Sequence, residues 1–141
     1  MRDLKYLFAY TVPISVYISF ISTGIWTYSA VVYVFLVIPL LDLILGEEKD
    51  NLPDESVASI QNKWIFDVML YLNIPIVFGL LFVAFSSIQT NDFNTLETIG
   101  IAISTGVLLA TNGINVAHEL GHRRTYFARF TSKLLYMPCL Y

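Results

Sequence analysis

Long apolar stretches alternate with short polar segments along most of this chain. Four stretches come close to about 20 apolar residues, the length that an α-helix needs to cross a hydrocarbon layer about 30 Å thick. They cover approximately residues 6–23, 25–45, 64–88 and 96–117, and the last continues as a helix to about residue 122. The pattern predicts an all-α integral membrane protein, with four transmembrane helices in this chain as part of a larger helical bundle.

The polar segments between these stretches predict how the helices connect. A short Thr-Gly turn separates the first two stretches and predicts a tight helical hairpin. Residues 46–63 form an acidic, proline-containing loop. Asn73 and Pro75 lie inside the third stretch, where we expect a kink because proline lacks a backbone N–H and its ring clashes with the preceding turn.

Composition and charge support a membrane protein and suggest its orientation. The chain is 56% hydrophobic and 13% charged, whereas soluble domains carry about 25% charged residues. Its net charge of −3 argues against a nucleic-acid partner, because phosphate binding requires clustered Lys and Arg. With the N-terminus inside, all 8 Lys and Arg fall on one side of the four helices. The positive-inside rule then places residues 46–63 and the end of the fourth helix in the cytoplasm.

The fourth stretch carries a stripe of polar side chains. At about 100° per residue, one helical face within an arc of roughly 60° holds Ser104, Thr111, Asn115, His118 and His122. Polar side chains inside a membrane are costly and normally face a bundle interior, a cavity or a functional site. We therefore expect this stripe to face inward.

His118 and His122 are the candidate metal ligands. Their i, i+4 spacing places both imidazoles on one helical face, where they can converge on one ion. Imidazole binds zinc, iron, copper and nickel, so the pair does not select the metal. The chain contains only 2 histidines, and even a catalytic zinc ion takes three protein ligands. The pair therefore predicts part of a metal site.

Three further polar residues are candidates for orienting these ligands. Asn115 precedes His118 by almost one turn, and could orient an imidazole or join two helices. Glu119 could act as a general base, as a hydrogen-bond partner of a ligand, or only as an interfacial charge. Asp42, and likewise Asp67, is expected at the depth of the histidines, where its carboxylate could hold a ligand or extend to water.

The letters HELGH, residues 118–122, also fit the H-E-x-x-H motif of zinc proteases, in which the glutamate activates water. An intramembrane zinc metalloprotease is therefore an alternative function. A non-catalytic membrane subunit is another. The motif fixes only three positions, so its surroundings must distinguish these possibilities.

Two separate segments resemble the membrane-bound alkane monooxygenases. NVAHELGHRRTYFARFTSKLLY, residues 115–136, resembles their first histidine box, and PLLDLILGEEKDNLPDE, residues 39–55, resembles the segment that joins their second and third helices. Glu48 and Leu52 stand where an Asp and a Pro are expected, and arginines follow the box where lysine is common. Intramembrane zinc proteases usually carry their motif in an early helix and have no counterpart to the second segment.

The resemblance implies a non-haem di-iron hydroxylase of the fatty acid desaturase-like superfamily. His118 and His122 map onto the first box of ligands for two iron ions, and most ligands would lie outside these residues. The implied reaction inserts oxygen from O2 into the terminal C–H bond of medium or long alkanes, with electrons from rubredoxin and rubredoxin reductase. The implied location is the bacterial inner membrane, among lipids.

The same resemblance predicts what these 141 residues contribute. We expect residues 1–141 to be the N-terminal part of a single transmembrane di-iron domain, inactive alone, whose first three apolar stretches line a channel for the alkane. No residue is assigned as catalytic.

Overall fold

The computed structural model describes residues 8–45 and 64–140. These residues form helices and the turns between them, with no strand. The predicted all-α class is confirmed for them. The loop predicted over residues 46–63, and the basic residues Arg2, Lys5, Lys49 and Lys63, lie outside the described part of the chain.

The prediction of four transmembrane helices is wrong by one. Among residues 8–45 and 64–140, three helices are long and apolar enough to cross a membrane: Gly24–Leu45, Trp64–Thr90 and Thr95–Gly121. The first apolar stretch gives only the shorter helix Phe8–Ile21, whose α-helical part is α1, Thr11–Ile21. At 1.5 Å per residue this helix rises only about 20 Å, less than the hydrocarbon thickness of about 30 Å. It ends because Ser22 and Thr23 are extended and Gly24 has a φ of +63°.

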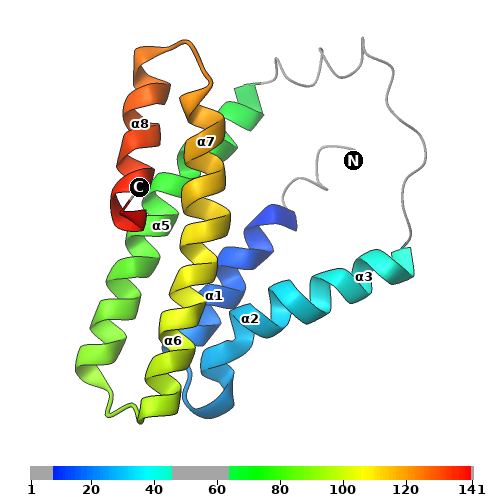
Figure 1. Cartoon of the computed structure of the whole chain (residues 1–141), viewed down its shortest axis with the longest axis vertical. Helices are drawn as coiled ribbons and strands as arrows, with labels where there is room; N and C mark the ends of the chain where they lie inside the picture. The colour runs from blue at the N-terminus through cyan, green and yellow to red at the C-terminus, as the bar shows by residue number, and fades with distance from the viewer. Residues whose placement is uncertain (1–7, 46–63, 141) are drawn as a thin grey trace.

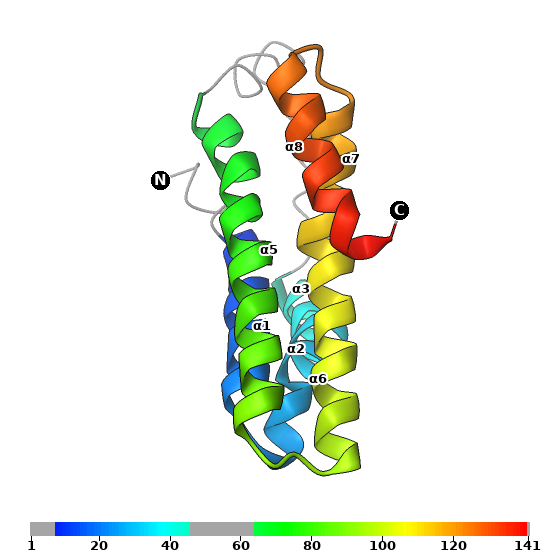
Figure 2. The same ribbon diagram turned by 90° about the vertical axis from the view of Figure 1, so that its left-hand side faces the viewer.

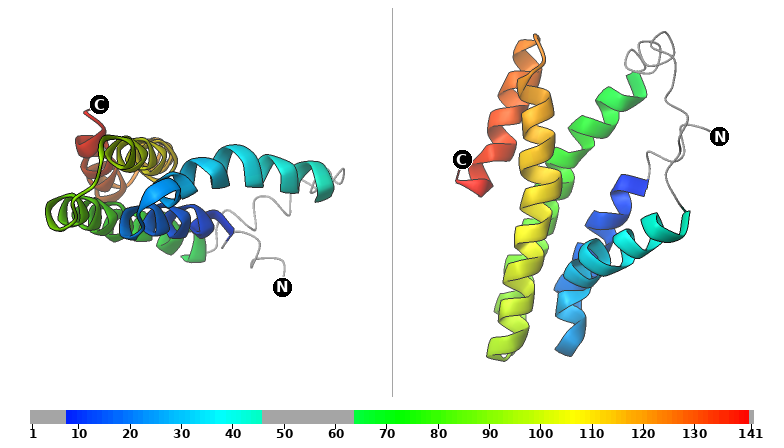
Figure 3. Two further views of the ribbon diagram at one scale, coloured as in Figure 1. Left: turned by 90° about the horizontal axis from the view of Figure 1, so that it is seen from below. Right: turned by 45° about the vertical axis from the view of Figure 1, so that its right-hand side comes forward.

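The second apolar stretch first packs against α1 and then leaves it. It consists of η2 (Gly24–Tyr28), α2 (Ser29–Val32), the π-helical turn η3 (Tyr33–Val37) and α3 (Ile38–Leu45). The predicted hairpin is confirmed near the turn, where the hydroxyls of Ser19 and Ser29 are 3.0 Å apart. Beyond η3, α3 leads away from the other helices (Figures 1 and 3).

The third and fourth stretches form two long antiparallel helices that are joined at one end of the molecule (Figure 2). α5 spans Trp64–Thr90 and continues through Pro75, so the proline does not end it. The fourth stretch consists of α6 (Thr95–Leu108), the π-helical turn η4 (Leu109–Ile114) and α7 (Asn115–Gly121).

A further helix follows the histidines and was not predicted. α8, Tyr126–Tyr136, turns back alongside α7 and is followed by the 3-10 turn η5, Met137–Cys139 (Figures 1 and 2). Thr125 caps its N-terminus by accepting a hydrogen bond from the backbone N–H of Ala128. The residues that α8 buries recur at helical spacing: Ala128, Thr131, Ser132 and Leu135.

The core between these helices mixes apolar and small polar side chains. Val16, Phe20, Ile101 and Leu108 are fully buried. Buried polar residues occur on α1, η2, α5, α6, η4 and α8: Ser15, Ser19, Thr27, Asn73, Ser87, Ser104, Asn112, Thr131 and Ser132. Among the described residues, every buried side-chain nitrogen or oxygen has a hydrogen-bond partner. Small residues that hydrogen-bond across helices are typical of membrane bundles, where helix backbones approach closely.

Candidate metal centre

The two histidine rings meet at the end of α7. Their Nε2 atoms are 3.0 Å apart, and the ring centroids are separated by 4.6 Å with an angle of 85° between the planes. Both side chains are exposed. The i, i+4 spacing therefore does bring the two imidazoles together on one side of the helix.

The geometry of this pair fits two neighbouring ligands of one metal ion. Nitrogen ligands lie about 2.1 Å from a divalent transition metal, and two such bonds at a right angle separate the nitrogens by about 3.0 Å, as in octahedral coordination. A neutral histidine pair can also share one N–H···N hydrogen bond at this distance. Among the described residues, no group of three or more His, Cys, Asp or Glu side chains could hold a metal ion. The assignment of His118 and His122 as ligands stays a prediction.

The chain after the histidines is fixed by a hairpin between α7 and α8. The Ser132 hydroxyl donates to the carbonyl of Ala117 at 2.6 Å, one residue before His118. The Arg129 side chain donates to the carbonyls of Arg123 and Arg124 at 3.3 and 3.4 Å. The Ser132 bond ties α8 to α7, and the Arg129 bonds satisfy backbone carbonyls in the turn that follows α7.

An ion pair connects this hairpin to α5. The guanidinium of Arg123, directly after His122, donates a hydrogen bond to the carboxylate of Asp67 in the first turn of α5. Nearby, the ring centroids of Tyr71 and Phe127 lie 5.1 Å apart. The end of the fourth span is thereby held to the beginning of the third.

The structure places the predicted neighbours of the histidines differently. Asn115 and Glu119 lie on α7 with His118, and both side chains are exposed. α3, which carries Asp42, leads away from α7 (Figure 3). Asp67 instead is brought to the histidine end through Arg123. Roles for Asn115, Glu119 and Asp42 beside a ligand stay predictions.

The prediction that one polar stripe faces inward along the whole fourth stretch is wrong for its second half. Ser104 is buried and donates to the carbonyl of Thr27 at 2.8 Å, but Asn115, His118 and His122 are exposed. The cause is η4, a π-helical turn that accommodates one extra residue. Within η4 the buried residues are Asn112 and Gly113, and after it they are Ala117 and Leu120.

Sequence reasoning therefore missed Asn112 and the contact that it makes. Its side-chain amide donates to the side-chain oxygen of Asn73 at 2.7 Å. The sequence did contain a signal for this contact. Both asparagines stand inside predicted membrane helices, where a buried amide is costly unless it has a partner.

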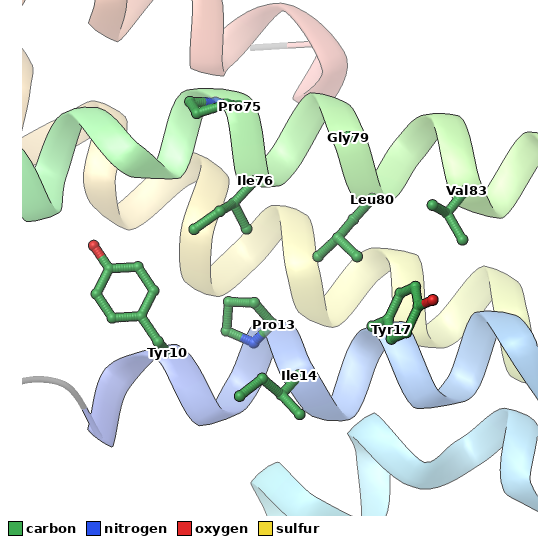
Figure 4. A pocket seen from close by; sticks show the side chains of 9 residues that line it. All are labelled: Tyr10, Pro13, Ile14, Tyr17, Pro75, Ile76, Gly79, Leu80 and Val83. Atoms are coloured by element: carbon green, nitrogen blue, oxygen red, sulfur yellow. The ribbon is translucent and has the colours of Figure 1, made fainter.

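An apolar groove lies on another side of the bundle, between α1 and α5 (Figure 4). Its volume is about 470 Å³, and residues of the first and third apolar stretches line it, among them Tyr10, Pro13, Tyr17, Pro75 and Leu80. The groove is consistent with the expectation that early helices offer apolar surface. Among its labelled residues, the tyrosines Tyr10 and Tyr17 carry the hydroxyl groups.

Comparison with characterised proteins gives one consistent result. The chain is 33% identical over 101 residues to an alkane 1-monooxygenase of Pseudomonas putida, covering 70% of this chain and 24% of that protein. It is 30% identical over 114 residues to alkane 1-monooxygenase 1 of Alcanivorax borkumensis, covering 79% and 28%. An alkane 1-monooxygenase of Ectopseudomonas oleovorans is 33% identical over 100 residues, covering 70% and 24%. The matched region is about a quarter of each of these relatives. No family model matches the chain.

Proposed function

This chain is a relative of the alkane 1-monooxygenases over 70% to 79% of its length, and from that premise we propose that the polypeptide carrying it hydroxylates alkanes in a membrane. The observation that supports this proposal most directly is the convergence of His118 and His122 at the end of a membrane span. The relatives are named for that reaction, and the histidine pair supplies ligands of a suitable kind.

We assign His118 and His122 two ligand positions at a centre of two non-haem iron ions. Imidazole is a common iron ligand, and the 3.0 Å separation of the Nε2 atoms suits two adjacent positions. The matched region is about a quarter of each relative, so the remaining ligands would come from outside these residues. For that reason we expect the 141 residues alone to be inactive.

The iron centre would supply the activation of O2. In the overall reaction one oxygen atom enters the terminal C–H bond of the alkane and the other leaves as water, with two electrons and two protons consumed. We propose rubredoxin, reduced by rubredoxin reductase, as the electron donor. Rubredoxin would deliver its electrons from the aqueous phase. This assignment therefore agrees with a metal centre at the end of a helix, and would not agree with one in the middle of the membrane.

The described residues would position the ligands and shape the surroundings. Arg123 and Asp67 hold the end of α7 to α5, and Ser132 ties α8 to the backbone next to His118. The exposed apolar side chains of the three spans suit contact with lipid, in which alkanes dissolve. We place the protein in the bacterial inner membrane with the histidines on the cytoplasmic side, since Arg123, Arg124, Arg129 and Lys133 gather at that end of the sequence.

The test uses the complete polypeptide that carries this sequence, purified in detergent. We expect iron in the purified protein, conversion of octane to 1-octanol with a reducing system, and loss of both in His118→Ala. Asp92→Asn, in the turn at the opposite end, is the matched control and keeps both. An active preparation without iron, or His118→Ala with unchanged iron and turnover, would refute the proposal.

The zinc protease alternative predicts a different dependence on Glu119. A protease of the H-E-x-x-H type holds zinc and needs this glutamate to activate water. Zinc in the purified protein, together with peptide cleavage that Glu119→Gln abolishes, would establish that activity. A non-catalytic subunit would tolerate the loss of both histidines. We expect neither result, because the relatives are monooxygenases.

A further inference from the structure

The π-helical turn η4 lies directly before the helix that carries the histidines. In this turn the backbone N–H of Asn115 donates to the carbonyl of Ala110, five residues earlier, where an α-helix would use the residue four earlier. One additional residue is therefore accommodated between α6 and α7. Because each residue of an α-helix turns by about 100°, this extra residue sets the direction in which every side chain of α7 points.

The helical register after η4 decides which side chains of α7 are buried and which are exposed. Leu120 is fully buried, whereas Glu119 and the two histidines are exposed. If η4 became regular α-helix, each later residue would rotate by about 100°, and Glu119 would take the buried place of Leu120. The histidines would turn away from their present direction by the same angle. The π-helical turn is thus what aims the metal-binding pair.

A chain of hydrogen bonds holds this turn to α5 and α1. The Asn112 side-chain oxygen accepts from the Thr111 hydroxyl at 2.8 Å, and the Asn112 amide donates to Asn73 at 2.7 Å. The Asn73 amide donates to the carbonyl of Met69 at 2.9 Å, which also accepts from the Tyr10 hydroxyl at 2.6 Å. Figure 4 shows Tyr10 extending from α1 toward α5.

The position of the two asparagines favours a role in holding the π-helical turn over a general contribution to helix packing. Asn112 is 7% exposed and Asn73 is 6% exposed, so each amide needs its partner in an apolar environment. Asn112 belongs to the π-helical turn itself. Asn73 lies two residues before Pro75, which leaves the carbonyl of Tyr71 without its helical N–H donor. An irregular turn in one helix is therefore fixed against a proline-containing turn in its neighbour.

We propose that Asn112 and Asn73 are positioning residues, which hold the π-helical turn and thereby direct His118 and His122 toward the metal. This inference rests on the proposed function for its metal, but the register of α7 can be measured without any metal. The two asparagines do not touch the histidines, and they would act only through the helix between them.

The first measurement reads the register directly. In the complete polypeptide with every native cysteine replaced by serine, Cys139 among them, Glu119→Cys and Leu120→Cys are introduced one at a time and labelled with a maleimide in detergent. We expect Glu119→Cys to react at least tenfold faster than Leu120→Cys. Adding Asn112→Leu should reduce or reverse this ratio. Thr105→Val is the matched control, because the Thr105 hydroxyl bonds only to Ile101 in its own helix, and it should leave the ratio unchanged.

The second measurement reads the metal site in the polypeptide without introduced cysteines. We expect Asn112→Leu to weaken iron binding by about tenfold or more, as much as the loss of a residue that hydrogen-bonds a ligand, because both imidazoles would rotate away from the other ligands. The spectrum of the remaining iron should change as well. Deletion of Ala110, an exposed residue of η4, should then restore binding in the same variant. The deletion removes the extra residue, so a regular helix would aim the histidines correctly.

The outcomes separate this inference from the proposed function. A labelling ratio and an iron spectrum that Asn112→Leu leaves unchanged would overturn the positioning role, and so would a loss that the Ala110 deletion fails to restore. A ratio that shifts in a polypeptide that is active without iron would support the register role while refuting the proposed function. If Asn112→Leu does not accumulate, Asn112→Ser replaces it, since its shorter side chain cannot reach Asn73.

Discussion

The two ends of the long helices use their polar groups in opposite ways. At the end where η2 meets α6, side chains bond to neighbouring backbone: Glu97 accepts from the N–H of Gly24 at 2.6 Å, and the Tyr28 hydroxyl donates to the carbonyl of Leu96 at 2.7 Å. At the histidine end, the rings of His118 and His122 face one another and solvent-accessible space. The first end uses these polar groups to fix the fold. The histidine end is also fixed, by Ser132 and Arg129, but it leaves the two imidazoles exposed, as candidate ligands must be.

The difference separates stability from function along one helix. Glu97 and His118 belong to the span Thr95–Gly121, and His122 directly follows it. Glu97 completes a capping box with Asn94, accepting from its N–H at 2.8 Å while it also holds the hairpin turn at Gly24. The histidines have no comparable bond to backbone. Substitutions near Glu97 should therefore change folding, and substitutions of the histidines should change metal binding.

The largest effect on stability is expected from Gly100→Ala, at the end where η2 meets α6. A methyl group at Gly100 would stand 2.8 Å from a ring carbon of Tyr28 and 2.9 Å from Cβ of Thr27, so α6 and η2 would have to separate. Such overpacking costs about 1–3 kcal/mol. We expect a clear fall in the thermal unfolding midpoint, measured by circular dichroism in detergent.

The control for this substitution is Gly106→Ala in the same helix. Nothing lies within 4 Å of the added methyl group there, and replacing glycine by alanine favours a helix by about 1 kcal/mol. The unfolding midpoint should stay the same or rise. If both variants behaved alike, the close approach of η2 to α6 would not contribute to stability.

The features that could be predicted from the sequence are those that depend on local spacing. Apolar length predicted the spans, and the i, i+4 spacing predicted that the histidine rings converge. The first helix was overestimated, since Ser22 and Thr23 are extended and an apolar count does not distinguish extended from helical residues. α8 could have been found, because Thr125 is a favourable cap and apolar or small residues follow it at helical spacing.

The features that could not be predicted depend on contacts between distant residues. The π-helical turn η4 is held by Asn73, which is 39 residues away from Asn112 in sequence. Uniform helical geometry therefore placed the histidines on the face of Ser104, and this was wrong. The pairing of Arg123 with Asp67, 56 residues apart, likewise required the packing of α7 on α5.

An intermediate effect is expected at the link between the histidine end and α5. Asp67→Asn removes the charge that pairs with Arg123. Because the side chains of Arg123 and Asp67 are 28% and 47% exposed, solvent screens the pair and its loss should cost about 0–1 kcal/mol. The thermal midpoint should fall less than in Gly100→Ala, and high salt should reduce the difference from wild type. A fall as large as that of Gly100→Ala would show that this end also fixes the fold.

The smallest effect on stability is expected from the histidines themselves. His118→Ala and His122→Ala remove exposed side chains whose rings contact each other, and exposed substitutions usually change the free energy of unfolding by no more than about 0.5 kcal/mol. The comparison must be made after chelation, because a bound metal stabilises the state that binds it. In metal-free protein both variants should unfold at the wild-type midpoint, whereas with metal present only the wild type should gain stability. A large loss in metal-free protein would mean that the imidazole pair is a structural contact, and the separation of stability from function along this span would then fail.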